Sequence, residues 1–198
     1  TCALPICATI IGGIMGPILQ SNGLANQEVF NSGAKLVAGQ NAAVVTNQFV
    51  DQFITFGGSG LTLGLVCTML YFSKSRQYKE LGKLSIIPGL FNINEPIIFG
   101  FPVVFNPIMA IPFILAPVIS AIMVYVSIAT GIVEPFRAIS VPWTTPFIIS
   151  GFLIGGVKAA ILQIAVFSMT VAVYFPFFKY QDKLAYQEEQ KIGTEATV

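Results

Sequence analysis

The stretch Asn92-Ile93-Asn94-Glu95-Pro96-Ile97-Ile98-Phe99-Gly100 places one carboxylate and two carboxamides inside a long apolar region. An acidic side chain at the centre of a bilayer helix is unfavourable by about 2.5–3.5 kcal/mol on insertion scales, so it usually faces a cavity, a partner or a ligand. Pro96 restricts Glu95 to extended backbone and is itself suited to begin a helix. We therefore expect Glu95 to lie at a break between two helical arms.

A simpler interpretation gives this stretch no functional role. Glu95 would only cap the second arm, where the positive end of the helix dipole favours a carboxylate, and Asn94 would satisfy loose backbone donors. The cost of placing a carboxylate in an apolar region favours an additional role, as a contact for a ligand or a partner.

The composition predicts a membrane protein. Hydrophobic residues make up 55% of the 198-residue chain and charged residues only 10%, against about 25% in typical soluble domains. The mean hydropathy is +0.78. A net charge of +1 does not suggest a nucleic-acid surface, and the lack of histidine excludes histidine-based catalytic triads and metal sites. We therefore expect no nucleic-acid partner and no metal.

Four apolar runs predict membrane-spanning helices. They cover most of residues 2–19, residues 52–73, residues from about 111 to 133, and residues 159–178. A run of 20 or more uncharged residues is enough for a span of about 30 Å. Residues 20–52 are rich in Asn and Gln, and they predict either a loop with a short amphipathic helix at the interface or the polar lining of a solute path. The glycine-rich segment 56–64 lacks the lysine of a phosphate-binding loop and predicts a helix break or a close helix contact.

Prolines predict two re-entrant hairpins. Residues 84–133 contain six prolines, too many for a single span, and we expect a hairpin from 84 to about 107 with its tip near Glu95. Residues 138–157 are interrupted by Pro142-Trp143-Thr144-Thr145-Pro146, which predicts a second hairpin entering from the opposite side. Non-helical backbone inside the hydrocarbon core of a bilayer is tolerated only beside protein or a water-filled cavity. The expected fold class is an all-α integral membrane protein with transmembrane helices and two re-entrant hairpins.

The chemistry of the two expected tips suits a sugar. Glu95, Asn94 and Asn92 can exchange hydrogen bonds with hydroxyl groups, and the indole of Trp143 can pack on the apolar face of a pyranose ring. Two alternatives remain: Trp143 as an interfacial aromatic residue, and Glu95 as the proton or cation relay of an ion-coupled transporter or channel. A third possibility is a structural membrane subunit that binds no solute.

Three motifs carry a family resemblance: the run 89–102 with Asn-Ile-Asn-Glu-Pro-Ile-Ile-Phe-Gly at its centre, Asn106-Pro107, and Val141-Pro142-Trp143-Thr144-Thr145-Pro146. With them, residues 11–180 resemble the permease component, enzyme IIC, of the phosphoenolpyruvate-dependent sugar phosphotransferase system, in its lactose/cellobiose/diacetylchitobiose branch. The resemblance implies a multi-pass, homodimeric permease of the inner or plasma membrane. It also implies a disaccharide bound by Glu95 and Asn94, with Glu95 near the hydroxyl to be phosphorylated and Trp143 lining the pocket.

The resemblance also implies a partner. A phosphocysteine on a IIB protein or domain would be the phosphoryl donor, so this chain needs no cofactor and carries no phosphorylation site of its own. Members of the branch carry a Gly-Ile-His-Gly motif near the start of this region, whereas this chain has no histidine and residues 1–7 do not match. We therefore expect a truncated chain that lacks the amino-terminal half with its dimer contacts.

We expect two parts: a partial substrate-binding transmembrane domain over residues 1–180 and a polar, frayed tail over residues 181–198. The basic segment 74–83 predicts that its side of the membrane is cytoplasmic, and the tail is expected on the same side.

Overall fold

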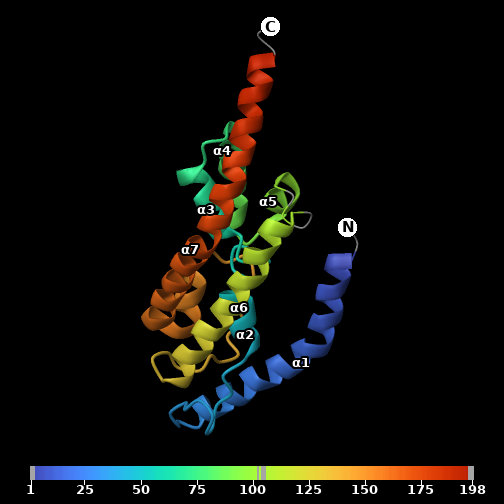
Figure 1. Cartoon of the computed structure of the whole chain (residues 1–198). Helices are drawn as coiled ribbons and strands as arrows, with labels where there is room; N and C mark the ends of the chain where they lie inside the picture. Colours follow the sequence, from blue (N-terminus) through green and yellow to red (C-terminus); the bar gives the residue numbers. More distant parts are fainter. Residues whose placement is uncertain (1–2, 102, 104–105, 196–198) are drawn as a thin grey trace.

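The computed structural model describes residues 3–101, 103 and 106–195, and its regular elements are helices joined by irregular segments (Figure 1). Within these ranges the only bridge between extended segments is an isolated one between Ala38 and Ala42. This confirms the predicted all-α class. The elements in chain order are α1 (Ala3–Asn31), α2 (Asn47–Phe49), the π-helical turn η1 (Val50–Ile54), α3 (Leu63–Phe72), α4 (Arg76–Leu90), α5 (Glu95–Gly100), α6 (Pro107–Ala129) and α7 (Ile149–Glu195).

Two helices of the described chain, α6 and α7, are long and apolar enough to cross a membrane. The 23 residues of α6 extend about 34 Å at 1.5 Å per residue. The helix begins at Pro107, four residues before the predicted start, because the side chain of Asn106 accepts hydrogen bonds from the backbone N–H groups of Ile108 and Met109. Its outward side chains are apolar, as lipid requires: Ile111, Ile114, Leu115, Val118 and Ile122.

The predicted span over residues 52–73 is wrong. This run consists of the end of η1, an irregular segment over residues 55–62, and the ten-residue helix α3. Gly57, Gly58 and Gly60 have φ angles of +69°, +89° and +80°, which break any right-handed helix. The interpretation of this glycine-rich segment as a helix break is confirmed, and α3 covers about half of a bilayer.

The first predicted hairpin is present as α4, the turn 91–94 and α5. Its tip lies where the sequence predicts it, immediately before Glu95. Its first arm begins at Arg76 and not at residue 84, because Ser75 caps α4 by accepting a hydrogen bond from the N–H of Tyr78 at 3.3 Å. Most of the predicted basic connection is therefore helical, and only Ser73–Ser75 join α3 to α4.

The first helix is longer than predicted. α1 continues to Asn31, so the polar residues that follow residue 19 begin on a helix and not in a loop. Asn22 and Asn26 lie one turn apart, and both hold the loop over residues 32–46. The buried Asn26 donates to the carbonyls of Ala43 (2.9 Å) and Phe136 (2.8 Å), and Asn22 donates to that of Val45 (3.0 Å).

The second predicted hairpin has one extended arm and one short helical arm. Residues 132–146 leave the end of α6 without forming a helix, and α7 then begins at Ile149. Non-helical backbone at Gly155 and Gly156 separates its first turns from the long continuation. In Figure 1 that continuation runs alongside α6 and then beyond the rest of the chain to the carboxyl end.

The prediction of a frayed tail is wrong for residues 181–195, because α7 continues as a helix across position 181 to Glu195. The last three residues of the predicted tail, 196–198, lie outside the described residues. Its polar end binds the α3–α4 turn. The buried carboxylate of Asp182 accepts hydrogen bonds from the Ser73 hydroxyl (2.7 Å) and from the N–H groups of Lys74 (2.9 and 3.1 Å) and Ser75 (3.0 Å). The turn and the tail therefore lie on the same side of the molecule.

Candidate functional site

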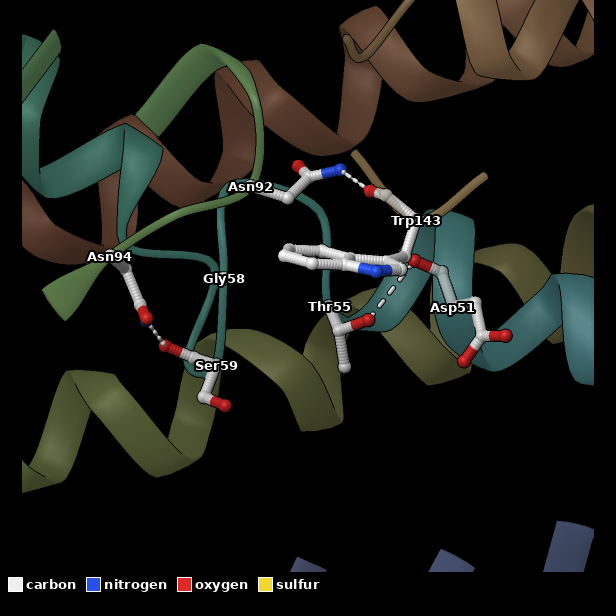
Figure 2. A pocket seen from close by; sticks show the side chains of 7 residues that line it. All are labelled: Asp51, Thr55, Gly58, Ser59, Asn92, Asn94 and Trp143. Carbon is white, nitrogen blue, oxygen red and sulfur yellow. Dashed lines mark hydrogen bonds between the residues drawn. The ribbon is translucent and has the colours of Figure 1, made fainter. Parts of the chain in front are cut away.

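A pocket of about 280 Å³ lies where the irregular segments converge. Figure 2 shows that its lining comes from η1 and the following loop, from the tip of the first hairpin and from the second hairpin. The size is near the lower end of the roughly 300–1,000 Å³ typical of small-molecule sites. Polar residues, one glycine and one tryptophan form the lining: Asp51, Thr55, Gly58, Ser59, Asn92, Asn94 and Trp143.

The two hairpin tips meet, as the sequence predicts. The Asn92 carboxamide nitrogen donates to the backbone carbonyl of Trp143 and, at 3.2 Å, to that of Thr145. Its oxygen accepts from the N–H of Gly57 in the glycine-rich loop. One side chain therefore ties three walls of the pocket together, and both of its polar atoms are already engaged with backbone.

Asn94 also reaches another segment, although it is the N-cap residue of α5. Its side chain makes no capping hydrogen bond. Instead its nitrogen donates to the Ser59 carbonyl at 3.0 Å (Figure 2). A Cβ on Gly58 would overlap the Asn94 side chain, so only glycine allows the loop to come this close. The simpler interpretation, in which Asn94 satisfies loose donors of α5, is therefore wrong.

Glu95 begins α5 and is solvent-exposed beside the pocket, and it is not among the lining side chains. Within the described part of the chain its carboxylate has neither a hydrogen-bond nor an ion-pair partner. The break between two helical arms is where the sequence predicts it. The carboxylate is free to accept hydrogen bonds from a ligand that extends past Asn94.

Trp143 lies on the loop before α7, and the residue is 62% exposed. In Figure 2 its indole points into the pocket, with Asn92 and Thr55 nearby. The sequence correctly predicted that Asn92, Asn94 and Trp143 come together. The sequence indicated Asp51 only as part of a polar segment, and it did not identify Thr55 or Ser59 as site residues. These residues are far from the hairpin tips in the sequence, and no local pattern shows that they contact the same pocket.

Asp51 and Thr55 lie one turn apart on η1 and its end. The Asp51 carboxylate accepts a hydrogen bond from the Asn47 side chain at 2.6 Å, and the Thr55 hydroxyl donates to the Asp51 carbonyl at 3.0 Å. A carboxylate held in this way keeps lone pairs for hydroxyl groups of a ligand. Within residues 20–52, Asp51 contributes to the lining of the pocket, which favours the interpretation of a polar lining for this last part of the segment.

Side chains from the two spanning helices satisfy the broken backbone behind the pocket. The Tyr174 hydroxyl donates to the Gly60 carbonyl at 2.6 Å, the Ser120 hydroxyl to the Phe53 carbonyl at 2.7 Å, and the Gln163 carboxamide to the Gln52 carbonyl at 2.8 Å. All three of these side chains are fully buried. Irregular backbone at membrane depth requires such partners, because lipid offers none.

Strained backbone conformations occur in the segments that form the pocket. Among the described residues, the non-glycine positions with positive φ are Leu61 (+55°), Asn92 (+65°) and Ile148 (+73°). They lie in the glycine-rich loop, at the tip of the first hairpin and in the second hairpin. Such conformations cost of order 1–3 kcal/mol each and cluster at ligand-binding sites.

Comparisons with known proteins identify relatives of this chain. Residues 7–117, more than half of the chain, match the family model described as "Phosphotransferase system, EIIC". The chain is 49% identical over 187 residues to the cellobiose-specific EIIC component of Geobacillus stearothermophilus, covering 92% of this chain and 40% of that one. It is 42% identical over 187 residues to the lichenan permease IIC component of Bacillus subtilis (strain 168), covering 93% and 40%.

A solved structure has the same fold. The crystal structure of ChbC, the IIC component of the N,N'-diacetylchitobiose-specific phosphotransferase system, matches with a TM-score of 0.86 and 43% identity, over 92% of this chain and 42% of that one. The chain therefore spans about two fifths of the length of these relatives. The family match and the shared fold identify the chain as a member of the EIIC family of the phosphotransferase system, a family of membrane permeases.

Proposed function

We propose that this chain is the sugar-binding part of a phosphotransferase-system permease, which moves a disaccharide across the membrane for phosphorylation by a IIB partner. The observation that carries the proposal is the pocket between the two hairpin tips. The exposed indole of Trp143 lies there together with residues that carry carboxamide, hydroxyl and carboxylate groups. A pyranose presents hydroxyl groups around its edge and C–H groups on its faces, so this combination suits it.

The substrate class is a β-linked disaccharide. The names of the relatives refer to cellobiose, lichenan and diacetylchitobiose, all of which contain β-linked glucose-type rings. In the proposed complex Trp143 stacks on one ring, while Asn94 and Asn92 lie at the tip beside the second. Glu95, exposed and without a partner among the described residues, accepts hydrogen bonds from the hydroxyl that is to be phosphorylated.

Asn92 contributes differently from the other three residues. Because its carboxamide already bonds to Gly57, Trp143 and Thr145, its main contribution is to hold the pocket walls, and one free lone pair of its oxygen is left for the sugar.

The proposal includes an orientation and an assembly. The α3–α4 turn and the polar end of α7 lie on the cytoplasmic side, where the IIB partner delivers its phosphoryl group. Exposed Lys74, Arg76 and Lys79 near the turn support this by the positive-inside rule. The 181–198 segment is the cytoplasmic tail, and residues 1–180 belong to the substrate-binding domain. The permease is a homodimer of the plasma membrane whose subunit contacts lie in a half that this chain does not contain.

The test is binding and uptake of radiolabelled cellobiose by the full-length protein. We expect Glu95→Gln and Trp143→Ala each to raise the Kd at least tenfold, which corresponds to about 1.4 kcal/mol. Uptake into vesicles should require phosphoenolpyruvate and the IIB protein. Uptake that continues without the phosphoryl donor and follows the membrane potential would instead favour an ion-coupled transporter with Glu95 as its relay. Unchanged binding in both variants would exclude the proposed site.

A further inference from the structure

Gln163 joins two walls of the pocket from behind, although it lies on α7 outside the lining. Its carboxamide oxygen accepts hydrogen bonds from the N–H groups of Ile148 (2.7 Å) and Gly151 (3.0 Å) in the second hairpin. Its nitrogen donates to the Gln52 carbonyl of η1 (2.8 Å) and to the Ser150 hydroxyl (3.0 Å). The side chain is fully buried, and all four of its usual hydrogen bonds are made within the protein.

The two segments that Gln163 connects carry different parts of the lining. η1 and its end present Asp51 and Thr55, while the second hairpin presents Trp143. A shift between them would change the position of the indole relative to Asp51 and Thr55, and with it the shape of the pocket. The position of Ile148, five residues after Trp143, depends directly on Gln163, and its backbone is strained at φ +73°.

Apolar contacts also join these segments, but they constrain the geometry less. Phe53 of η1 stacks on Phe136 with ring centroids 4.8 Å apart, and Phe56 stacks on Phe147 at 5.8 Å. Aromatic rings tolerate sliding over one another, whereas hydrogen bonds weaken steeply when their angle or length changes. A Cβ on Gly151 would collide with the Gln163 oxygen, so the hairpin approaches this carboxamide as closely as glycine allows.

We propose that Gln163 is a positioning residue of the sugar site: its buried carboxamide sets the distance between the wall formed by η1 and the wall that carries Trp143. This inference rests on the proposed function, because it assigns the pocket to a sugar. Gln163 does not touch the ligand, and it determines affinity by holding the groups that do.

The experiment uses the full-length protein in lipid nanodiscs, with [14C]cellobiose binding and, without sugar, hydrogen–deuterium exchange of the peptide that covers residues 147–152. Gln163→Met keeps the length of the side chain and removes all four hydrogen bonds. Gln163→Glu keeps an acceptor for the two N–H groups and serves where the methionine variant does not fold. Thr68→Val is the matched control, because it removes a buried hydroxyl bond to the Gly64 carbonyl inside α3, away from the pocket.

We expect Gln163→Met to raise the Kd for cellobiose at least tenfold and to speed exchange in residues 147–152 at least tenfold. Gln163→Glu should keep slow exchange, and its Kd for cellobiose should be more than twofold above that of wild type and below that of the methionine variant. Thr68→Val should stay within twofold of wild type in both measurements. A Kd within twofold of wild type in Gln163→Met, or in Gln163→Glu where the former does not fold, overturns the inference.

The two proposals fail in different ways. If the wild-type protein binds neither cellobiose nor lactose nor diacetylchitobiose, the proposed function is wrong. The exchange measurement needs no sugar, so it still decides whether Gln163 holds the second hairpin: unchanged exchange in Gln163→Met overturns that role, and faster exchange supports it.

Discussion

Replacing Gly58 with alanine tests whether the glycine-rich loop approaches the first hairpin as closely as the structure has it. Gly58 has a φ of +89°, and a Cβ at this position would overlap the side chain of Asn94. The left-handed backbone costs an alanine about 1–2 kcal/mol, and forcing an extra methyl group into a packed site costs about 1–3 kcal/mol. We therefore expect Gly58→Ala to lower the free energy of unfolding by about 2–5 kcal/mol.

Gly131→Ala separates these two costs. Gly131 has a similar φ of +77°, but nothing lies within 4 Å of the position that a Cβ would take there, so alanine meets only the backbone cost. The difference between the two variants, about 1–3 kcal/mol, measures the collision with Asn94. The assay is unfolding of the full-length protein in mixed micelles by titration with SDS, with both variants measured under the same conditions.

The collision of the Gly58→Ala methyl group with Asn94 should also weaken ligand binding. Displacing Asn94 breaks its hydrogen bond to the Ser59 carbonyl and moves a residue that lines the pocket. We expect cellobiose to bind at least tenfold more weakly to Gly58→Ala and normally to Gly131→Ala. Equal loss of stability in the two variants, together with wild-type affinity, would refute the close approach of this loop to the hairpin tip.

Three further predictions concern groups that hold the fold around the site. Tyr174→Phe leaves the buried Gly60 carbonyl without its donor, and it should cost about 1–3 kcal/mol of unfolding free energy in the same titration. Asp182→Ala removes the acceptor of the Ser73, Lys74 and Ser75 donors, so limited proteolysis should cut the α3–α4 turn faster than in wild type. The Ser75 hydroxyl and the N–H groups of Gln77 and Arg76 lower the pKa of Glu189 below its usual value. The ionised Glu189 carboxylate therefore stabilises the folded state. This contribution is fully present at pH values above the unfolded pKa and is lost as the pH falls through the lower folded pKa. Proteolysis of the tail should accelerate at acid pH in wild type, and Glu189→Gln should show this faster cleavage already at pH 7.

The breaks in the helices could be predicted where their causes are local. Pro96 after Glu95 marks the first tip, and Pro142 and Pro146 on either side of Trp143 mark the second. The contact between the tips was also predicted, and the bond from Asn92 to the Trp143 carbonyl confirms it. These predictions succeeded because proline restricts its own backbone whatever surrounds it.

The error at residues 52–73 has a different cause. An uncharged run shows that a segment can enter an apolar environment, but not that its backbone stays helical. The broken loop is stable there because Tyr174 and Gln163, more than 100 residues later in the chain, supply donors to its carbonyl groups and to those of η1. Asp51 and Thr55 were not predicted as site residues for the same reason, since nothing near them in the chain indicates that they share a pocket with Trp143.

Composition and local motifs were thus enough to establish a helical membrane protein, two re-entrant tips, and Asn94 and Trp143 as neighbours in one pocket. The folded arrangement showed that the Asn92 carboxamide is engaged with backbone, that Glu95 is exposed beside the pocket, and that Asp51 completes the lining. The physical reason is that proline and glycine restrict the chain at their own positions, whereas a polar group's free hydrogen-bonding capacity depends on every neighbour in space. Those neighbours come together only when the chain folds.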